Sequence, residues 1–356
     1  MRINMRRLFL LSISLLIGSV LSISGLSLAA EEKTEETGDI EYEAGFYYTV
    51  KKGDTLWDLS QRFNDTPWQW PDLWEENTQI SNPHWIYPGE RIRIFRKKDH
   101  HRYAKPQKEV EEPEAQITAS APEEGPPPEV HYLYANLDRV GFIRKPAVEP
   151  LGTIIKSRDD KTLISKDDYI YIKPSNSNGK SGFSPGMRLT VFRTLNPTDE
   201  RSAEETIGTQ HLMLGLAEIV RVESQWALAK ILQNYRTIYA NDLVMAYDPR
   251  NPQIKVIDST PDLDGKIIVS EDHTKLIGEL FIAFIDKGKE DNVLPGQVYD
   301  LYYQETAGQG KSTMLLDKVN IGSFLVLHTE QTTSTVVVTD SSKQLLPGQP
   351  FHSPGK

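Results

Sequence analysis

The sequence predicts a multi-domain protein with a small α+β domain, a disordered linker and two tandem all-β modules. Three observations predict this architecture. Five of the six tryptophans fall between Trp57 and Trp85. A charged, proline-rich stretch follows this cluster. Beyond residue 131, short runs typical of strands recur between turn residues, and the second half of that region repeats the first. A repeat on this scale predicts two structural modules of the same kind.

The N-terminal segment has the features of an export signal. Arg2, Arg6 and Arg7 precede an apolar run over 8–28, and Ser27-Leu28-Ala29 fits a small-x-small cleavage site. We therefore predict a signal peptide at 1–29, an acidic flexible spacer at 30–45, and localisation in the periplasm or cell envelope. The apolar run is longer than usual, so an uncleaved membrane anchor stays open as the alternative.

Composition excludes several classes of partner and mechanism. The chain has no cysteine, which excludes disulfides and every cysteine-nucleophile enzyme. Without the three arginines of the signal, 37 basic residues face 50 acidic ones, a balance of −13. Such an acidic chain does not hold a polyphosphate by charge, so nucleic acid is not an expected partner.

The tryptophan-rich stretch, residues 46–95, predicts the order strand, helix, helix, strand. Tyr47–Val50 alternates like a strand, and Arg91–Phe95 alternates in the same way at the other end. Thr55 is suited to be a helix N-cap, with Asp58 three residues later as its capping-box partner. Prolines at Thr66-Pro67 and Pro71 favour a second helix start.

This stretch resembles a LysM domain. The resemblance rests on Tyr48–Ser60 (YTVKKGDTLWDLS), on Leu73 and Asn77, and on Tyr87–Ile94 (YPGERIRI). It implies a βααβ fold that binds glycans containing N-acetylglucosamine, namely peptidoglycan or chitin, without a metal or cofactor. It further implies a groove between two loops. Their residues are Gly53, Asp54, Thr55 and Leu56 in the first loop, and Asn82, Pro83, His84, Trp85, Ile86 and Tyr87 in the second.

The tryptophans divide into two expected roles. A fifty-residue domain has little core, so Trp68, Trp70 and Trp74 are expected to pack inwards. Trp85 and Tyr87 lie on the second loop and are the candidates to stack on sugar.

The remainder of the chain is predicted to be a linker at 96–130 and two β modules at 131–253 and 254–356. The linker is rich in proline and charge, which favours an extended form of ~3 Å per residue. In the modules, 152–173 matches 265–286 without a gap, 183–192 matches 293–302, and 216–224 matches 321–329. Small barrels or sandwiches are expected, because a closed sheet has no free edge.

Two functional hypotheses follow. The first is a non-catalytic envelope protein that binds peptidoglycan through the LysM-like domain, with the β modules as a structural platform or a surface for an envelope protein partner. The alternative is a peptidoglycan hydrolase with an unrecognised catalytic β module. No HExxH string is present, which argues against zincin-type peptidases, whereas a pair of carboxylates for a glycosidase stays open.

Overall fold

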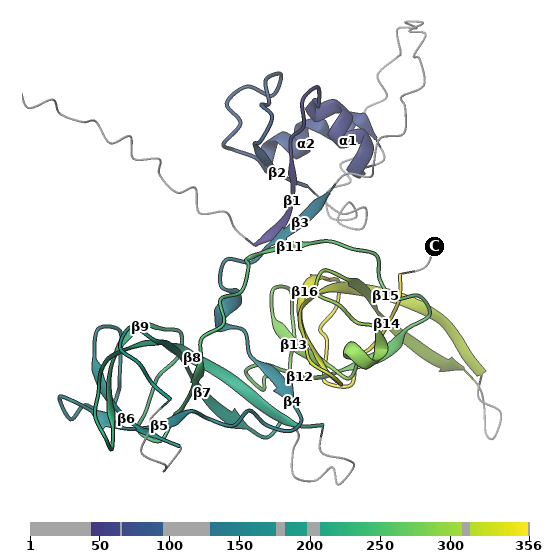
Figure 1. Ribbon diagram of the computed structural model, residues 1–356. Coiled ribbons are helices and arrows are strands. Elements are labelled where there is room, and N and C mark those ends of the chain that lie inside the picture. Colours follow the sequence, from purple (N-terminus) through teal and green to yellow (C-terminus); the bar gives the residue numbers. More distant parts are fainter. Residues whose placement is uncertain are drawn as a thin grey trace, which may run out of the picture. The chain divides into compact units, whose positions relative to one another are not determined.

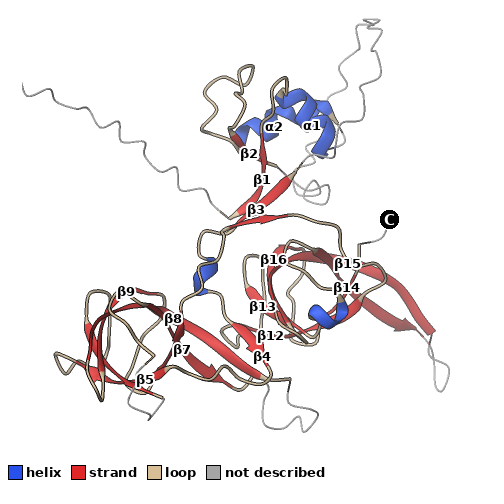
Figure 2. Cartoon of the chain, viewed as in Figure 1, coloured by secondary structure: helices blue, strands red, loops and turns tan. Residues whose placement is uncertain are grey.

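The structure is a computed structural model that describes residues 44–64, 66–94, 129–175, 182–197, 207–307 and 314–354. The predicted signal peptide and most of the predicted spacer and linker lie outside the described residues. Helices α1 and α2 belong to the N-terminal unit, and the rest of the described chain is mostly strand (Figures 1 and 2). Among these residues, no helix combines the length and apolar character needed to cross a membrane.

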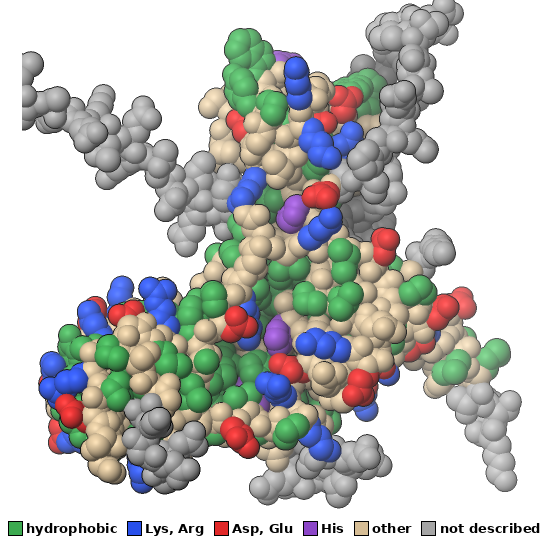
Figure 3. All heavy atoms as spheres, viewed as in Figure 1, with side chains coloured by type: hydrophobic (Ala, Val, Ile, Leu, Met, Phe, Trp, Pro, Cys, Tyr) green, Lys and Arg blue, Asp and Glu red, His purple; other side chains and the backbone are tan. Residues whose placement is uncertain are grey.

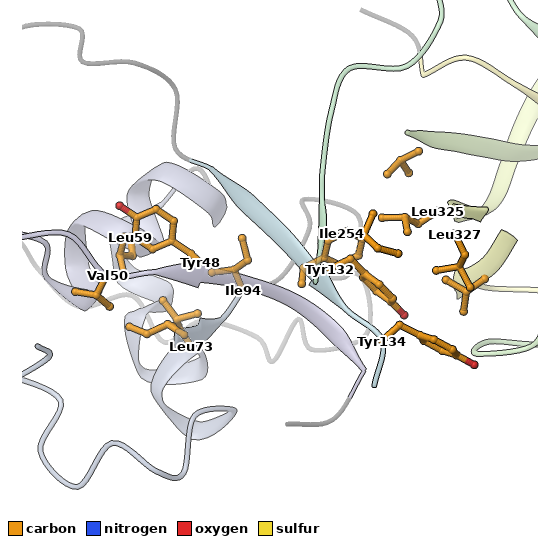
Figure 4. Packing of buried hydrophobic residues seen from close by; sticks show 14 of the residues in the cluster. Tyr48, Val50, Leu59, Leu73, Ile94, Tyr132, Tyr134, Ile254, Leu325 and Leu327 are labelled. Carbon is orange, nitrogen blue, oxygen red and sulfur yellow. The ribbon is translucent and has the colours of Figure 1, made fainter. Parts of the chain in front are cut away.

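The N-terminal unit has the predicted strand–helix–helix–strand order. It consists of β1 (Gly45–Thr49), α1 (Leu56–Asn64), the 3₁₀ turn η1 (Pro67–Gln69), α2 (Trp70–Glu75) and β2 (Arg91–Arg93). Strands β1 and β2 pair antiparallel, and Figure 4 shows labelled core residues between them and the two helices. The fully buried members include Leu59, Leu73 and Ile92. Apolar side chains at helical spacing thus supply the core of this small unit.

Two further strands extend the N-terminal sheet. β3 (Val130–Leu133) pairs antiparallel with the free side of β1, and β11 (Gln253–Lys255) pairs with β3. The sheet order is therefore β11-β3-β1-β2. Tyr48 of β1 lies opposite Ile92 on one side and Val130 on the other, so the chain leaves this sheet before the linker and rejoins it afterwards.

The first β module closes into a ring of strands. Its strands are β5 (Gly152–Ser157), β6 (Tyr169–Pro174), β7 (Arg188–Leu195), β8 (Thr209–Val222), β9 (Ala227–Asn234) and β10 (Leu243–Ala246). The order is β8-β7-β10-β5-β6-β9, and β9 also pairs with β8. One more strand, β4 (Phe142–Arg144), lies outside this ring and pairs with β8. The 3₁₀ turn η3 (Leu137–Arg139) precedes β4.

The second β module is a closed barrel with the same strand order. It contains β12 (Asp264–Ser270), β13 (Ile282–Ile285), β14 (Val298–Ala307), β15 (Met314–Thr329), β16 (Ser334–Ser341) and β17 (Pro350–His352), and the turn η4 (Lys289–Asp291). The order β12-β13-β16-β15-β14-β17 corresponds to β5-β6-β9-β8-β7-β10 of the first module. The predicted barrel-like β modules are confirmed.

Matching backbone hydrogen bonds show that the two barrels are structural repeats. The Ile164 N–H donates to the Ile238 carbonyl as that of Ile277 does to Leu345. The positions of left-handed backbone also correspond, since the glycine of each Pro-Gly turn, Gly186 and Gly296, has a positive φ.

One predicted match was out of register. The Ile219 N–H donates to Met187 and the Val326 N–H donates to Gln297, so residue 219 corresponds to 326 rather than to 324. A shift of two residues keeps every side chain on the same face of a strand, and the alternating pattern alone does not detect it.

Candidate functional site

The first predicted loop links β1 to α1 and is built for a tight turn. Gly53 has a φ of 97°, the left-handed region that glycine enters without a Cβ penalty. Thr55 then caps the helix, because its Oγ1 accepts the Asp58 N–H at 3.1 Å. The Thr55 hydroxyl also donates to the Asp58 carboxylate at 2.6 Å. The N-cap predicted for Thr55 is confirmed, and its capping-box partner Asp58 binds the Thr55 hydroxyl through its carboxylate.

Asp54 holds this loop in shape. Its Oδ2 accepts the Tyr48 hydroxyl and the Lys51 N–H, both at 2.7 Å. Arg62 of α1 lies 3.9 Å from its other oxygen. The carboxylate thus braces the turn between β1 and α1 and fixes the backbone of this loop.

Leu56, the last residue of the first predicted loop, is a core residue. Its side chain is 2 % exposed and belongs to the core beside Leu59 and Tyr48. Gly53 and Thr55 are the exposed residues of this loop.

The second predicted loop, residues 82–87, is held by two side-chain-to-backbone bonds. The Asn82 carbonyl oxygen of the side chain accepts the His84 N–H at 3.0 Å. Glu90 accepts the Tyr87 N–H at 2.9 Å. Asn82 also accepts the Trp85 N–H through its main-chain carbonyl at 3.0 Å. These bonds fix the conformation of a loop that has no regular secondary structure.

Backbone bonds join the two loops at their bases. The Val50 N–H donates to Glu90 at 2.8 Å, and the Gly89 N–H donates to Val50 at 2.9 Å. Val50 precedes the first loop and Gly89 follows the second, so both loops start from one end of the β1–β2 sheet. This is the arrangement that a groove between the two loops requires.

The second loop presents aromatic area to solvent. Trp85 is 66 % exposed and Tyr87 is 56 % exposed. Ile86 between them packs against the core, Pro83 is half-buried, and the exposed His84 ring lies 6.2 Å from that of Trp70. Alternation along this short segment sends Trp85 and Tyr87 outwards and Ile86 inwards.

The expected inward packing of the other tryptophans was wrong for Trp68 and incomplete for Trp74. Trp68 is 72 % exposed and meets Trp57 edge to face at 4.8 Å, because Pro67 starts a 3₁₀ turn instead of a longer helix. Trp74 is 36 % exposed, stacks on Trp70 and donates its Nε1–H to Ile80 at 2.7 Å. Only Trp70 packs against the core as expected.

Asn77 has a role that its position in the motif did not reveal. Its side chain is fully buried and links the end of α2 to β2. The Nδ2 group donates to Leu73 at 2.6 Å and to Arg93 at 2.9 Å, while Oδ1 accepts the Arg93 N–H at 2.7 Å. In the sequence, the sign of this structural role is a lone asparagine that follows the apolar face of a helix.

The most buried carboxylates of the first barrel and its neighbouring turn are engaged by cations. Asp168 accepts from Lys161, Asp242 binds Arg193 through both oxygens, and Glu271 pairs with Arg236 at 2.8 Å. Within the described ranges, no group of three or more His, Asp or Glu is placed to hold a metal ion. These three acids are thus used in ion pairs that stabilise turns.

Comparison with known proteins identifies the N-terminal unit. The family model for the LysM domain matches residues 48–95. A similar protein is the "Uncharacterized protein YqbP" of Bacillus subtilis (strain 168), 42% identical over 57 residues, which is 13% of this chain and 26% of that protein. The matched region covers about a quarter of that relative's length.

Proposed function

We propose that the LysM domain at residues 48–95 binds glycan strands containing N-acetylglucosamine, with peptidoglycan as its ligand. The observation that carries this proposal is the pair of exposed aromatic side chains, Trp85 and Tyr87, on a loop joined at its base to the Gly53–Leu56 loop. LysM domains bind glycans of this class.

The chemistry of the two loops suits such a ligand. Acetamido groups need backbone N–H and C=O partners, which the loop around Gly53 offers because Leu56 turns its side chain into the core. The apolar faces of sugar rings pack on flat aromatic surface, and Trp85 and Tyr87 supply it. A glycan needs no basic patch, in keeping with the acidic balance of the chain.

We further propose that the protein is non-catalytic and resides in the cell envelope, exported by the segment at 1–29. In this proposal the β modules, 131–253 and 254–356, are a structural platform or bind an envelope protein. The ion-paired state of Asp168, Asp242 and Glu271 supports it, because a glycosidase needs carboxylates free to act on a substrate.

Co-sedimentation of the mature full chain with purified peptidoglycan sacculi tests the binding. The double variant Trp85→Ala with Tyr87→Ala should lose most of the bound fraction. Trp68→Ala is the matched control, since it removes a similarly exposed tryptophan that belongs to neither loop. Equal loss in both variants, or no binding by the wild-type chain, would contradict the proposal.

A zymogram on peptidoglycan distinguishes the hydrolase alternative. The proposal predicts no clearing at the position of the chain. A clearing band that persists in the Trp85/Tyr87 variant would assign a reaction to the β modules.

A further inference from the structure

The second barrel carries a two-stranded arm with a free edge. Strands β14 and β15 continue past the barrel (Figure 1). The arm comprises Tyr303–Ala307 of β14 and Met314–Val319 of β15; we call it the outer arm. Over Gly322–Leu325 β15 pairs with both β14 and β16, but over the outer arm its ladder partners in the described chain all come from β14. Among the described residues, one edge of β15 is therefore open.

The outer arm exposes large apolar side chains. Met314 and Leu315 are each 67 % exposed, Val319 is 44 % exposed and Leu316 is 41 % exposed. They line a shallow pocket together with Tyr303. Open strand edges are normally protected, because they pair readily with another chain. An open edge flanked by exposed leucines is thus suited to bind a strand.

The first barrel shows what occupies the equivalent edge. The repeat relation places residues 210–212 of β8 at the positions of 317–319 in β15. In the first barrel β4 covers this edge, with Phe142 opposite His211 and Ile143 opposite Gln210 in an antiparallel ladder. The covered residues Gln210 and His211 are fully buried there, and so is Ile143 of the covering strand. The second barrel has the same arm, and no strand of the part of the chain that the structure describes covers it.

Charge indicates the composition of the missing strand. The strand β4 has two consecutive large apolar residues, Phe142 and Ile143, followed by the basic Arg144. The outer arm exposes Glu305 and Asp317, while its Lys318 is already paired with Asp264 at 3.0 Å. In Figure 3 hydrophobic and acidic side chains lie near this arm. A second copy of the chain would bring two acidic arms together, whereas a basic segment would offset their charge.

We propose that the free edge of β15, over Met314–Val319, binds an extended segment of a partner protein as an added antiparallel strand. The segment has the chemistry of β4, with consecutive large apolar residues followed by a basic residue. Main-chain hydrogen bonds hold the strand, and the leucines and valine of the arm select its apolar side chains. This site is independent of glycan binding by the LysM domain.

A peptide copy of β4 serves as the probe. A fluorescein-labelled peptide of residues 139–146, Arg-Val-Gly-Phe-Ile-Arg-Lys-Pro, is titrated into the full mature chain and followed by fluorescence anisotropy. Saturable binding is expected. The same peptide with Ile143→Pro lacks a backbone donor in the middle of the strand and should not bind.

Variants of the full chain locate the binding. Leu316→Lys should weaken peptide binding by at least about tenfold, because it replaces an exposed apolar side chain of the outer arm with a charge. Leu294→Lys, at a residue 48 % exposed before β14, is the matched control and should leave affinity unchanged. Thermal melting confirms that both variants fold.

Three results would overturn the proposal. The first is the absence of saturable binding at about 100 μM peptide, a concentration well above the dissociation constant expected of a working site. The second is equal weakening by both lysine substitutions, which would place the peptide elsewhere. The third is a wild-type dimer in sedimentation velocity that Leu316→Lys dissociates, which would make a second copy the occupant.

Discussion

The substitution Asn77→Ala should strongly destabilise the LysM domain while leaving the barrels folded. Asn77 is fully buried and its amide joins the last turn of α2 to β2 through Leu73 and Arg93. Its side chain makes three hydrogen bonds of 2.6 to 2.9 Å to backbone groups of these two elements.

The expected loss follows from these bonds. Each contributes about 1 kcal/mol net, so the three together contribute about 3 kcal/mol. The Arg93 N–H left facing the truncated residue adds about 1–3 kcal/mol where water cannot reach it. A domain of this size has a free energy of unfolding near the lower end of about 5–15 kcal/mol, so over half of it disappears.

Tryptophan emission reports this domain selectively, because five of the six tryptophans belong to it. In a Trp226→Phe background, urea titration should shift the emission midpoint strongly downwards for Asn77→Ala. Gln79→Ala is the control, since Gln79 is exposed and its two bonds are long, at 3.2 and 3.3 Å. A loss below about 0.5 kcal/mol for Asn77→Ala would refute the assigned role.

Three further predictions concern the cap, a strained turn and acid stability. Thr55→Ala should lower the free energy of unfolding of the LysM domain by about 0.5–2 kcal/mol, because it removes the N-cap of α1. The same emission titration measures this loss, and no change would mean that Asp58 alone holds the helix end. Leu280 has a φ of 64°, and the equivalent residue of the first barrel is Asp167, with a φ of 70°. Leu280→Asn should raise the melting temperature, because asparagine adopts this left-handed conformation more readily than leucine. A lower melting temperature would show that the exposed Leu280 side chain stabilises the fold. Burial lowers the pKa of His211 and His328, whose rings lie 4.7 and 5.5 Å from that of Phe142, and the His211 Nε2 accepts the Val148 N–H at 3.0 Å. Below about pH 6.5 the unfolded chain takes up protons that these folded side chains resist, so stability falls with acidification towards their lowered pKa values. Replacing both histidines by glutamine should flatten the decline of melting temperature between about pH 7.5 and 5.5; an unchanged slope would contradict this origin.

The duplicated barrels could be predicted because their repeat spans both strands and turns. Ile164 and Ile277 occupy matching bridges, and each Pro-Gly turn has its glycine at positive φ. The added strand β4 could not be predicted in the same way. Its three residues pair with β8 across about seventy positions of sequence, and a segment that short carries little periodic pattern.

In the N-terminal unit, too, some features could be predicted from the sequence and others could not. The βααβ order and the cap at Thr55 follow from local patterns of turn residues and apolar spacing. The exposure of Trp68 depends on a 3₁₀ turn of three residues after Pro67, which propensity does not distinguish from a helix start. The addition of β3 to β1 is a long-range pairing that no local pattern encodes.

The most direct test of glycan recognition is a residue-resolved titration of the protein with an N-acetylglucosamine tetrasaccharide, followed by amide chemical shifts. The two-loop site predicts that the largest changes fall at Gly53, Thr55, Trp85 and Tyr87. Changes centred on the exposed Trp57–Trp68 pair instead, with the two loops unaffected, would contradict it.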